Sequence, residues 1–209
     1  MYGAIDFYKK AKSCGIKPII GCEVYVAPNS RLVKDNSSNM YYHLVLLAEN
    51  NEGYENLIKL VSYGFIDGFY YKPRIDLDIL KKYSKGLIGS SACLAGNVAR
   101  SILRESYDKA KEVALMYEEI LGKGNFFLEL QDHGLREQKL VNQHLIKMSR
   151  ETGIPLICTN DSHYIYKEDS KAHDILLCIQ TGKTVNDEVR MRYEGSEFYV
   201  KSPQEMASL

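Results

Sequence analysis

Several residues of metal-binding type lie at or near the ends of apolar segments. Asp161 and His163 directly follow the apolar run 155–158. If this run is a buried strand, an Asp-x-His pair leaving it offers a carboxylate oxygen and an imidazole nitrogen to one point, which suits zinc or manganese. An Asx-type turn with a solvated histidine would have the same sequence, so both interpretations stay open at this point.

Glu23 and His43 lie in two consecutive apolar runs. Glu23 is inside GCEVYV, where burial of a carboxylate without a partner would be costly, so it either faces solvent or has a cation. His43 begins the next run, and residues 28–40 between them are rich in Asn and Ser with no helical period. Two strands joined by such a loop can be antiparallel, which would bring Glu23 and His43 to one edge of the sheet. A purely structural role for His43 is the alternative.

Cys93 follows the expected strand 86–90 among small residues. A thiolate there could bind metal, and an inert buried thiol is the alternative. Glu129 lies in the expected strand 126–130 and His133 follows it. Both are interpreted as groups that hydrogen-bond to the metal ligands or cap the strand end, and not as ligands. No Gly-x-Ser-x-Gly elbow is present, and the phosphate-loop pattern ending at Gly182 fails because Leu177 stands where a glycine is required.

These candidates depend on an alternation of strands and helices. Apolar and β-branched runs predict strands at 18–27, 42–48, 86–90, 126–130 and 156–159. Helical periodicity and capping signals predict helices at 5–14, 51–63, 76–83, 97–104, 107–121, 135–152 and 167–180, and from Ser202 onwards. Strands separated by helices favour parallel pairing, hence an α/β sheet or barrel. Both chain ends fall in expected helices, which is unlike the boundaries of a complete domain.

The composition is that of an ordinary globular protein. The 209 residues are 45% hydrophobic, and 27 basic residues balance 27 acidic ones. A single domain is the default at this length, and zero net charge removes the argument for a broad basic nucleic-acid surface. No segment resembles a membrane span or a signal peptide. Five cysteines without CxxC spacing predict reduced thiols and a cytoplasmic location.

Ordered segments along the whole chain resemble those of one known family. The segments are residues 1–28, YHLVLLAENNEGYENLIKLVS from Tyr42, GFYYKPR from Gly68, SACLAG from Ser91, LELQDHG from Leu128, TNDSHY from Thr159 and LLCIQTGK from Leu176. They resemble the polymerase and histidinol phosphatase (PHP) domain at the start of the bacterial DNA polymerase III alpha subunit. The resemblance implies a distorted seven-stranded β/α barrel, a PHP domain over residues 1–209, whose strand ends bind up to three divalent metal ions (zinc, manganese or magnesium). It also implies that the ligands are Glu23, His43, Cys93, Asp161 and His163.

The N-terminal part of the family pattern does not match. Family members open with a His-x-His strand, an acidic ligand and a Thr-Asp-His-Gly segment before the stretch that matches Met1–Ala4, and none of these is in this sequence. We therefore expect an incomplete barrel that lacks its first strand or strands, in a fragment without the polymerase domains. Strands 18–27 and 155–159 should border the gap, with an open sheet edge and an apolar cleft.

The resemblance implies two functions for the domain. It either hydrolyses phosphoesters with metal ions, as a proofreading 3′ to 5′ exonuclease, or it is a scaffold of the replicative polymerase. The expected partners are DNA, through the parent polymerase, and other polymerase III holoenzyme subunits such as a proofreading exonuclease subunit. A free-standing phosphatase is disfavoured by the segments GFYYKPR and LLCIQTGK. The fragment alone is expected to have no polymerase activity and little or no exonuclease activity.

Overall fold

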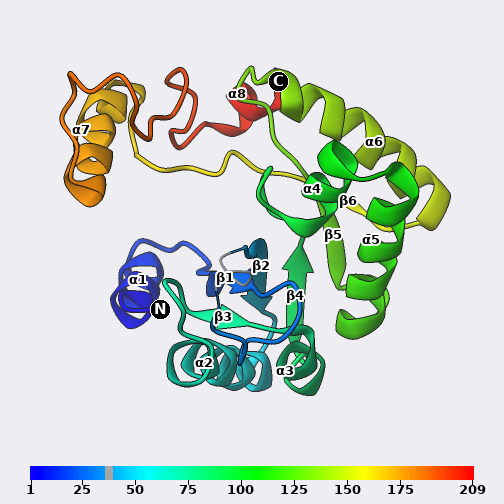
Figure 1. The fold of residues 1–209 in the computed structure, drawn as a ribbon. Coiled ribbons are helices and arrows are strands. Elements are labelled where there is room, and N and C mark those ends of the chain that lie inside the picture. Colours follow the sequence, from blue (N-terminus) through cyan, green and yellow to red (C-terminus); the bar gives the residue numbers. More distant parts are fainter. Residues whose placement is uncertain (36–39) are drawn as a thin grey trace. The chain divides into compact units, whose positions relative to one another are not determined.

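The chain folds as a mixed α/β structure around one six-stranded sheet (Figure 1). The computed structural model describes residues 1–35 and 40–209, so part of the expected loop 28–40 lies outside the described residues. The strands are β1 (Gly21–Val26), β2 (Tyr42–Ala48), β3 (Arg74–Ile75), β4 (Leu87–Ser90), β5 (Phe126–Leu130) and β6 (Leu156–Cys158), in the sheet order β3-β1-β2-β4-β5-β6. The predicted α/β class is confirmed, as a sheet consistent with a partial PHP-type barrel.

β1 and β2 form the antiparallel pair that the sequence predicts. Val24 and Val26 of β1 are buried, as are Leu44 and Leu46 of β2, while the residues between them are more exposed. This period of two places one face of the pair in the core and leaves the other face available for polar side chains.

The pairing of β2 with β4 corrects a prediction, because it is antiparallel and not parallel. The link from β2 to β4 is not a simple helical crossover: it contains α2 (Asn51–Ile66), the two-residue strand β3 and α3 (Leu77–Lys82), and β3 pairs in parallel with β1. β4 and β5 are parallel, as expected. Consequently β1, β3, β4 and β5 run in one direction, and β2 begins at the end of the sheet where β1 and β4 finish.

The remaining helices lie close to their predicted positions. They are α1 (Ala4–Ser13), α4 (Asn97–Arg104), α5 (Tyr107–Leu121), α6 (Arg136–Thr152), α7 (Ser170–Thr181) and α8 (Pro203–Ala207), with a short 3-10 turn η2 (Lys167–Asp169) before α7. The Ser202 capping box forms as predicted, because the Ser202 side chain accepts from the Glu205 N–H and the Glu205 carboxylate accepts from the Ser202 N–H. None of these helices, nor any other in the described part of the chain, is long and apolar enough to cross a membrane.

The sheet edges agree only in part with expectation. β6 is an edge strand, as predicted, but the opposite edge is β3 and not β1. β3 is too short to have a sequence signature, and it pairs only with Tyr25 and Val26. Beside the rest of β1 lies a cleft of about 190 Å³ lined mainly by apolar side chains, Phe65 and Ile75 among them. That missing strands would cover an apolar cleft stays a prediction.

The chain divides into two compact units. The first comprises Met1–Glu129 and His144–Ile157, and the second comprises Leu130–Gln143 and Cys158–Leu209. Each unit holds part of the predicted site: Glu23, His43 and Cys93 belong to the first, whereas Asp161 and His163 belong to the second. The two sets are therefore described separately.

Candidate metal centre

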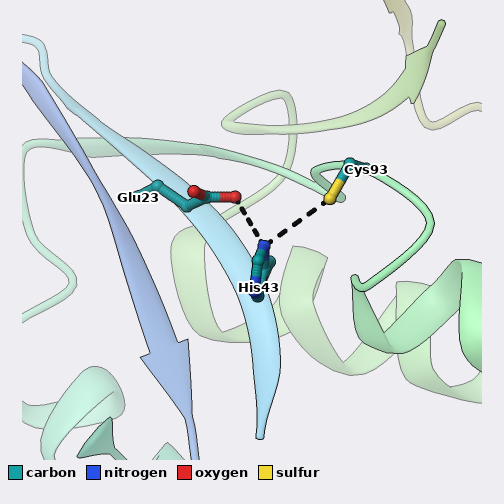
Figure 2. Close-up of side chains that lie close together, drawn as sticks. All are labelled: Glu23, His43 and Cys93. Atoms are coloured by element: carbon teal, nitrogen blue, oxygen red, sulfur yellow. Dashed lines mark hydrogen bonds and ion pairs between the residues drawn. The ribbon is translucent and has the colours of Figure 1, made fainter. Parts of the chain in front are cut away.

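Glu23, His43 and Cys93 converge in the first unit (Figure 2). The His43 Nδ1 atom lies 2.8 Å from Glu23 Oε1 and 3.6 Å from Cys93 Sγ. One donor atom from each residue lies within 4.8 Å of the other two. One nitrogen, one sulfur and one oxygen thus point toward a common position, with His43 between the other two.

Strand register explains how Glu23 reaches His43. Tyr25 pairs with His43 and Glu23 pairs with Val45 across the β1–β2 ladder. Because alternate residues of a strand share a face, Glu23 and His43 are diagonal neighbours on one face, within reach of a long side chain. The antiparallel pairing that the sequence predicts is what produces this neighbourhood.

The loop after β4 brings in Cys93. Its end is joined to the start of β2, since the His43 N–H donates to Ala95 O at 3.1 Å. Ala92 adopts a left-handed conformation with φ of 59°, and a Cβ atom at Gly96 would collide with the Ser91 carbonyl oxygen. The loop therefore turns sharply twice, and this tight path positions the Cys93 thiol beside His43 Nδ1.

The environment of His43 favours a charged imidazole when no metal is bound. Burial lowers the pKa of His43, but hydrogen bonds to Cys93 and Glu23 and the charges of these groups outweigh it and raise the pKa to about 9. Tyr25 and Tyr41 flank the ring, at centroid distances of 5.1 and 5.9 Å. At neutral pH the Nδ1 proton therefore lies between the Glu23 carboxylate and the Cys93 thiol, two groups that could also bind a metal ion.

The donor set fits a zinc-like ion. A tetrahedral site with metal–ligand bonds of about 2.0–2.3 Å separates its ligand atoms by about 3.3–3.8 Å. The separations of 2.8 and 3.6 Å lie near this range, and the third separation, between Glu23 and Cys93, is at most 4.8 Å. Three protein ligands of mixed O, N and S type also leave a fourth position open, as in catalytic zinc sites.

In the second unit, His163 has partners on both ring nitrogens. Nδ1 lies 2.7 Å from the Asp161 carbonyl oxygen and Nε2 lies 2.9 Å from the Tyr193 hydroxyl. This network assigns the proton to Nδ1, so that Nε2 accepts from Tyr193. The ring also packs edge-on against Phe198 and His173. His163 is exposed, but these contacts hold its ring in place, and it keeps its lone pair on Nε2.

His133 and Glu129 make structural contacts. The buried His133 ring donates from Nε2 to Asn160 O at 2.9 Å and accepts from Gln138 at 2.7 Å, while burial lowers its pKa. It thereby holds the residue before Asp161. The buried Glu129 carboxylate accepts a very short hydrogen bond from the Ser90 hydroxyl, at the end of β4. The supporting roles expected for these two residues stay a prediction.

Sequence reasoning missed the aromatic residues around His163. Tyr193 is 30 residues away and His173 lies on α7, and no local spacing connects either of them to a strand end. The convergence of all five predicted ligands stays a prediction, because they belong to two different compact units. What the structure brings together is Glu23 with His43 and Cys93, and separately Asp161 with His163.

Comparison with known proteins identifies the family. Residues 1–133 match the family model described as the PHP domain. The chain belongs to the PHP domain family. The match contains Glu23, His43 and Cys93, and also Glu129 and His133, but it ends before Asp161 and His163. The PHP assignment therefore covers the three converging donors directly.

Curated relatives match the PHP-containing chain over its full length. It is 51% identical over 211 residues to a protein of Borreliella burgdorferi, 47% identical over 211 residues to one of Treponema pallidum and 45% identical over 213 residues to one of Thermus aquaticus. Each of the three is named DNA polymerase III subunit alpha. The alignments cover 100% of this chain but only 17–18% of the relatives, so the chain spans less than a fifth of their length.

Proposed function

We propose that this chain is the PHP portion, over residues 1–209, of a DNA polymerase III alpha subunit, and that it binds divalent metal ions. The observation that carries the metal proposal is the convergence of Glu23, His43 and Cys93 donor atoms within 4.8 Å. The similarity of the whole chain to part of three proteins named as that subunit supports the assignment of the parent protein. Under this proposal, the partners are DNA, through the parent polymerase, and other holoenzyme subunits. The location is the cytoplasm.

The residues have distinct roles in the proposed centre. The His43 Nδ1 and the Cys93 thiolate provide the softer ligands, and the Glu23 carboxylate provides an oxygen and a compensating charge. Asp161 and His163 are proposed as ligands of a further divalent ion, because they stand at the family's Asp-x-His position. His163 would bind through Nε2, since its Nδ1 proton is donated to a carbonyl oxygen, an arrangement typical of metal-binding histidines.

In the whole polymerase, we propose that this centre hydrolyses phosphoesters at the 3′ end of DNA. Bound divalent ions would polarise the phosphate and lower the pKa of an attacking water. The protein side chains fix the ions, and Glu129 and His133 hold the strand ends that carry the ligands.

The metal proposal can be tested with Co²⁺ as a spectroscopic substitute for zinc. The purified chain should develop a thiolate-to-cobalt charge-transfer band, and Cys93→Ser should abolish it. Cys14→Ser is the matched control, because Cys14 is an exposed free cysteine outside the centre. An unchanged band in Cys93→Ser would overturn the assignment of Cys93 as a ligand.

The second candidate function is a scaffold role without hydrolysis. An assay of hydrolysis distinguishes the two. One observation favours the scaffold: α7 leaves Ile175, Leu176 and Ile179 exposed, as an interaction surface would. In a full-length alpha subunit with this sequence, metal-dependent release of nucleotides from a 3′ end, lost in His43→Ala, supports hydrolysis. Metal binding without any release supports the scaffold.

A further inference from the structure

A cavity in the second unit contains more positive than negative charge. It has a volume of about 230 Å³ and lies between the first turn of α7 and the segment 190–195. Three cationic side chains, one carboxylate and three hydroxyl groups are among its lining residues: Lys171, Arg190, Arg192, Asp174, Ser170, Tyr164 and Tyr193. The volume is below the roughly 300–1,000 Å³ typical of sites for drug-sized ligands, so a small anionic group suits it.

The single carboxylate in the cavity is already neutralised. Asp174 accepts from both terminal nitrogens of Arg190, with the longer contact at 2.7 Å, and this pairing lowers the pKa of Asp174. Lys171 and Arg192 therefore carry the excess positive charge. Within residues 1–35 and 40–209, the hydrogen bonds of Arg192 are two long contacts of 3.4 and 3.5 Å to backbone carbonyl oxygens, which leave its guanidinium available to an anion.

Arg190 contributes an additional unsatisfied donor. Its side chain is 6% exposed, and its buried Nε atom has no hydrogen-bond partner in the described part of the chain. A buried N–H group without an acceptor is unfavourable by about 1–3 kcal/mol. Because the Nε atom itself is buried, Arg190 contributes to the cavity through the charge of its guanidinium group.

We infer that this cavity binds a phosphate group. Arginine forks match the geometry of phosphate oxygens, and the Ser170 and Tyr193 hydroxyl groups add neutral donors. Ser170 and Lys171 also begin the 12-residue helix α7, whose N-terminal end favours anions. The inference goes beyond the proposed function because it requires no metal ion. The phosphate can come from free inorganic phosphate or from a nucleic-acid strand.

Tyr193 connects the cavity with a predicted ligand. It lines the cavity, and its hydroxyl group donates to His163 Nε2 at 2.9 Å. A phosphate that engages the Tyr193 hydroxyl would weaken this hydrogen bond and release the His163 lone pair. Phosphate binding should therefore also change the environment of His163.

The test is a ³¹P NMR titration of the whole chain in the presence of EDTA. Inorganic phosphate should bind saturably, and Arg192→Ala should weaken it about tenfold, the effect of one charge-assisted hydrogen bond. Lys183→Ala is the matched control: it removes one positive charge from the same unit at an exposed residue outside the cavity lining, and should change the affinity less than twofold. Arg190→Lys should also weaken binding, with folding verified by circular dichroism.

Further ligands distinguish the sources of the phosphate. A short single-stranded DNA with a terminal phosphate that binds more tightly than inorganic phosphate, again dependent on Arg192, identifies a nucleic-acid source, and equal affinity identifies free phosphate. Acetate should not compete. Equal binding by the wild type and Arg192→Ala, competition by acetate, or no saturable binding would overturn the inference. Because EDTA is present, such a failure is independent of any failure of metal binding.

Discussion

The two histidine environments are built differently. His43 lies in a paired strand, where backbone register alone fixes its distance from Glu23 and a loop pinned to the same strand adds Cys93. His163 follows the edge strand β6 in an irregular segment, where aromatic side chains fix its ring. Strand register can place metal ligands with little further support, whereas a ligand on a loop depends on specific neighbouring side chains.

The partners of the two rings differ in charge as well. His43 Nδ1 contacts a carboxylate and a thiol, groups that are anionic when they bind metal. The ring nitrogens of His163 contact a carbonyl oxygen and a phenol hydroxyl, both of which are neutral. The two groups beside His43 therefore favour a cation, whether a proton or a metal ion, at the position between Glu23 and Cys93.

The largest expected effect separates the two histidines directly. His43→Ala should weaken Co²⁺ or Zn²⁺ binding at the thiolate-containing site by about 100-fold or more, since it removes the nitrogen that contacts both other donors. His163→Ala should change the cobalt affinity of this site, followed by the same thiolate-to-cobalt band, less than threefold. The measurement is a metal titration followed by the charge-transfer absorbance.

His144→Ala is the control, because His144 lies on α6 beside Tyr107 and outside the three-residue group. If His163→Ala abolished the band as completely as His43→Ala, the two environments would act as one metal site, and the distinction drawn between them would fail.

The sequence anticipated most of the secondary structure because caps and periodicity are local signals. The bounds of β2, α4, α5 and β5 match their predictions, and the Glu23–His43 neighbourhood follows from the predicted antiparallel pair. β3 has only two residues, too few to show a period, so the sequence did not reveal this strand between β2 and β4. The predicted parallel direction of β4 relative to β2 was wrong. The contacts of Tyr193 with His163 join distant segments, and only tertiary packing brings these together.

The next largest effect concerns the turn that carries Cys93. Gly96→Ala should destabilise the chain by about 1–3 kcal/mol, because the added Cβ collides with the Ser91 carbonyl oxygen and forces the backbone to shift. It should also weaken cobalt binding, since the shift moves Cys93 away from His43. Gly3→Ala is the matched control, with no atom within 4 Å of its added Cβ. Equal unfolding midpoints in denaturant for the two variants would contradict this account.

The charge on His43 predicts a pH dependence of stability in the metal-free chain. Its pKa rises from about 6.5 when unfolded to about 9 when folded, so protonated His43 stabilises the fold fully below about pH 6.5, and this stabilisation is lost as pH rises through about 9. The Glu23 side chain is 42% exposed, and solvent screening reduces the expected effect to about 1 kcal/mol. Guanidinium unfolding in EDTA at pH 6 and pH 9.5 measures it, and His43→Gln should abolish this contribution. A wild-type profile that is the same as that of His43→Gln would be the contrary result.

The smallest expected effect sharpens the account of His163. Tyr193→Phe removes the hydroxyl group that occupies Nε2, so a metal ion no longer competes with this hydrogen bond, which contributes about 1 kcal/mol. Zinc should then perturb the His163 side-chain NMR signals at about fivefold lower concentration. Tyr199→Phe is the control, because the Tyr199 hydroxyl donates to Glu205 and not to a histidine. If both variants respond to zinc like the wild type, Tyr193 only packs against the ring. His163 would then be as accessible to a metal ion as His43 in its strand. The two histidines would differ only in the charge of their partner groups.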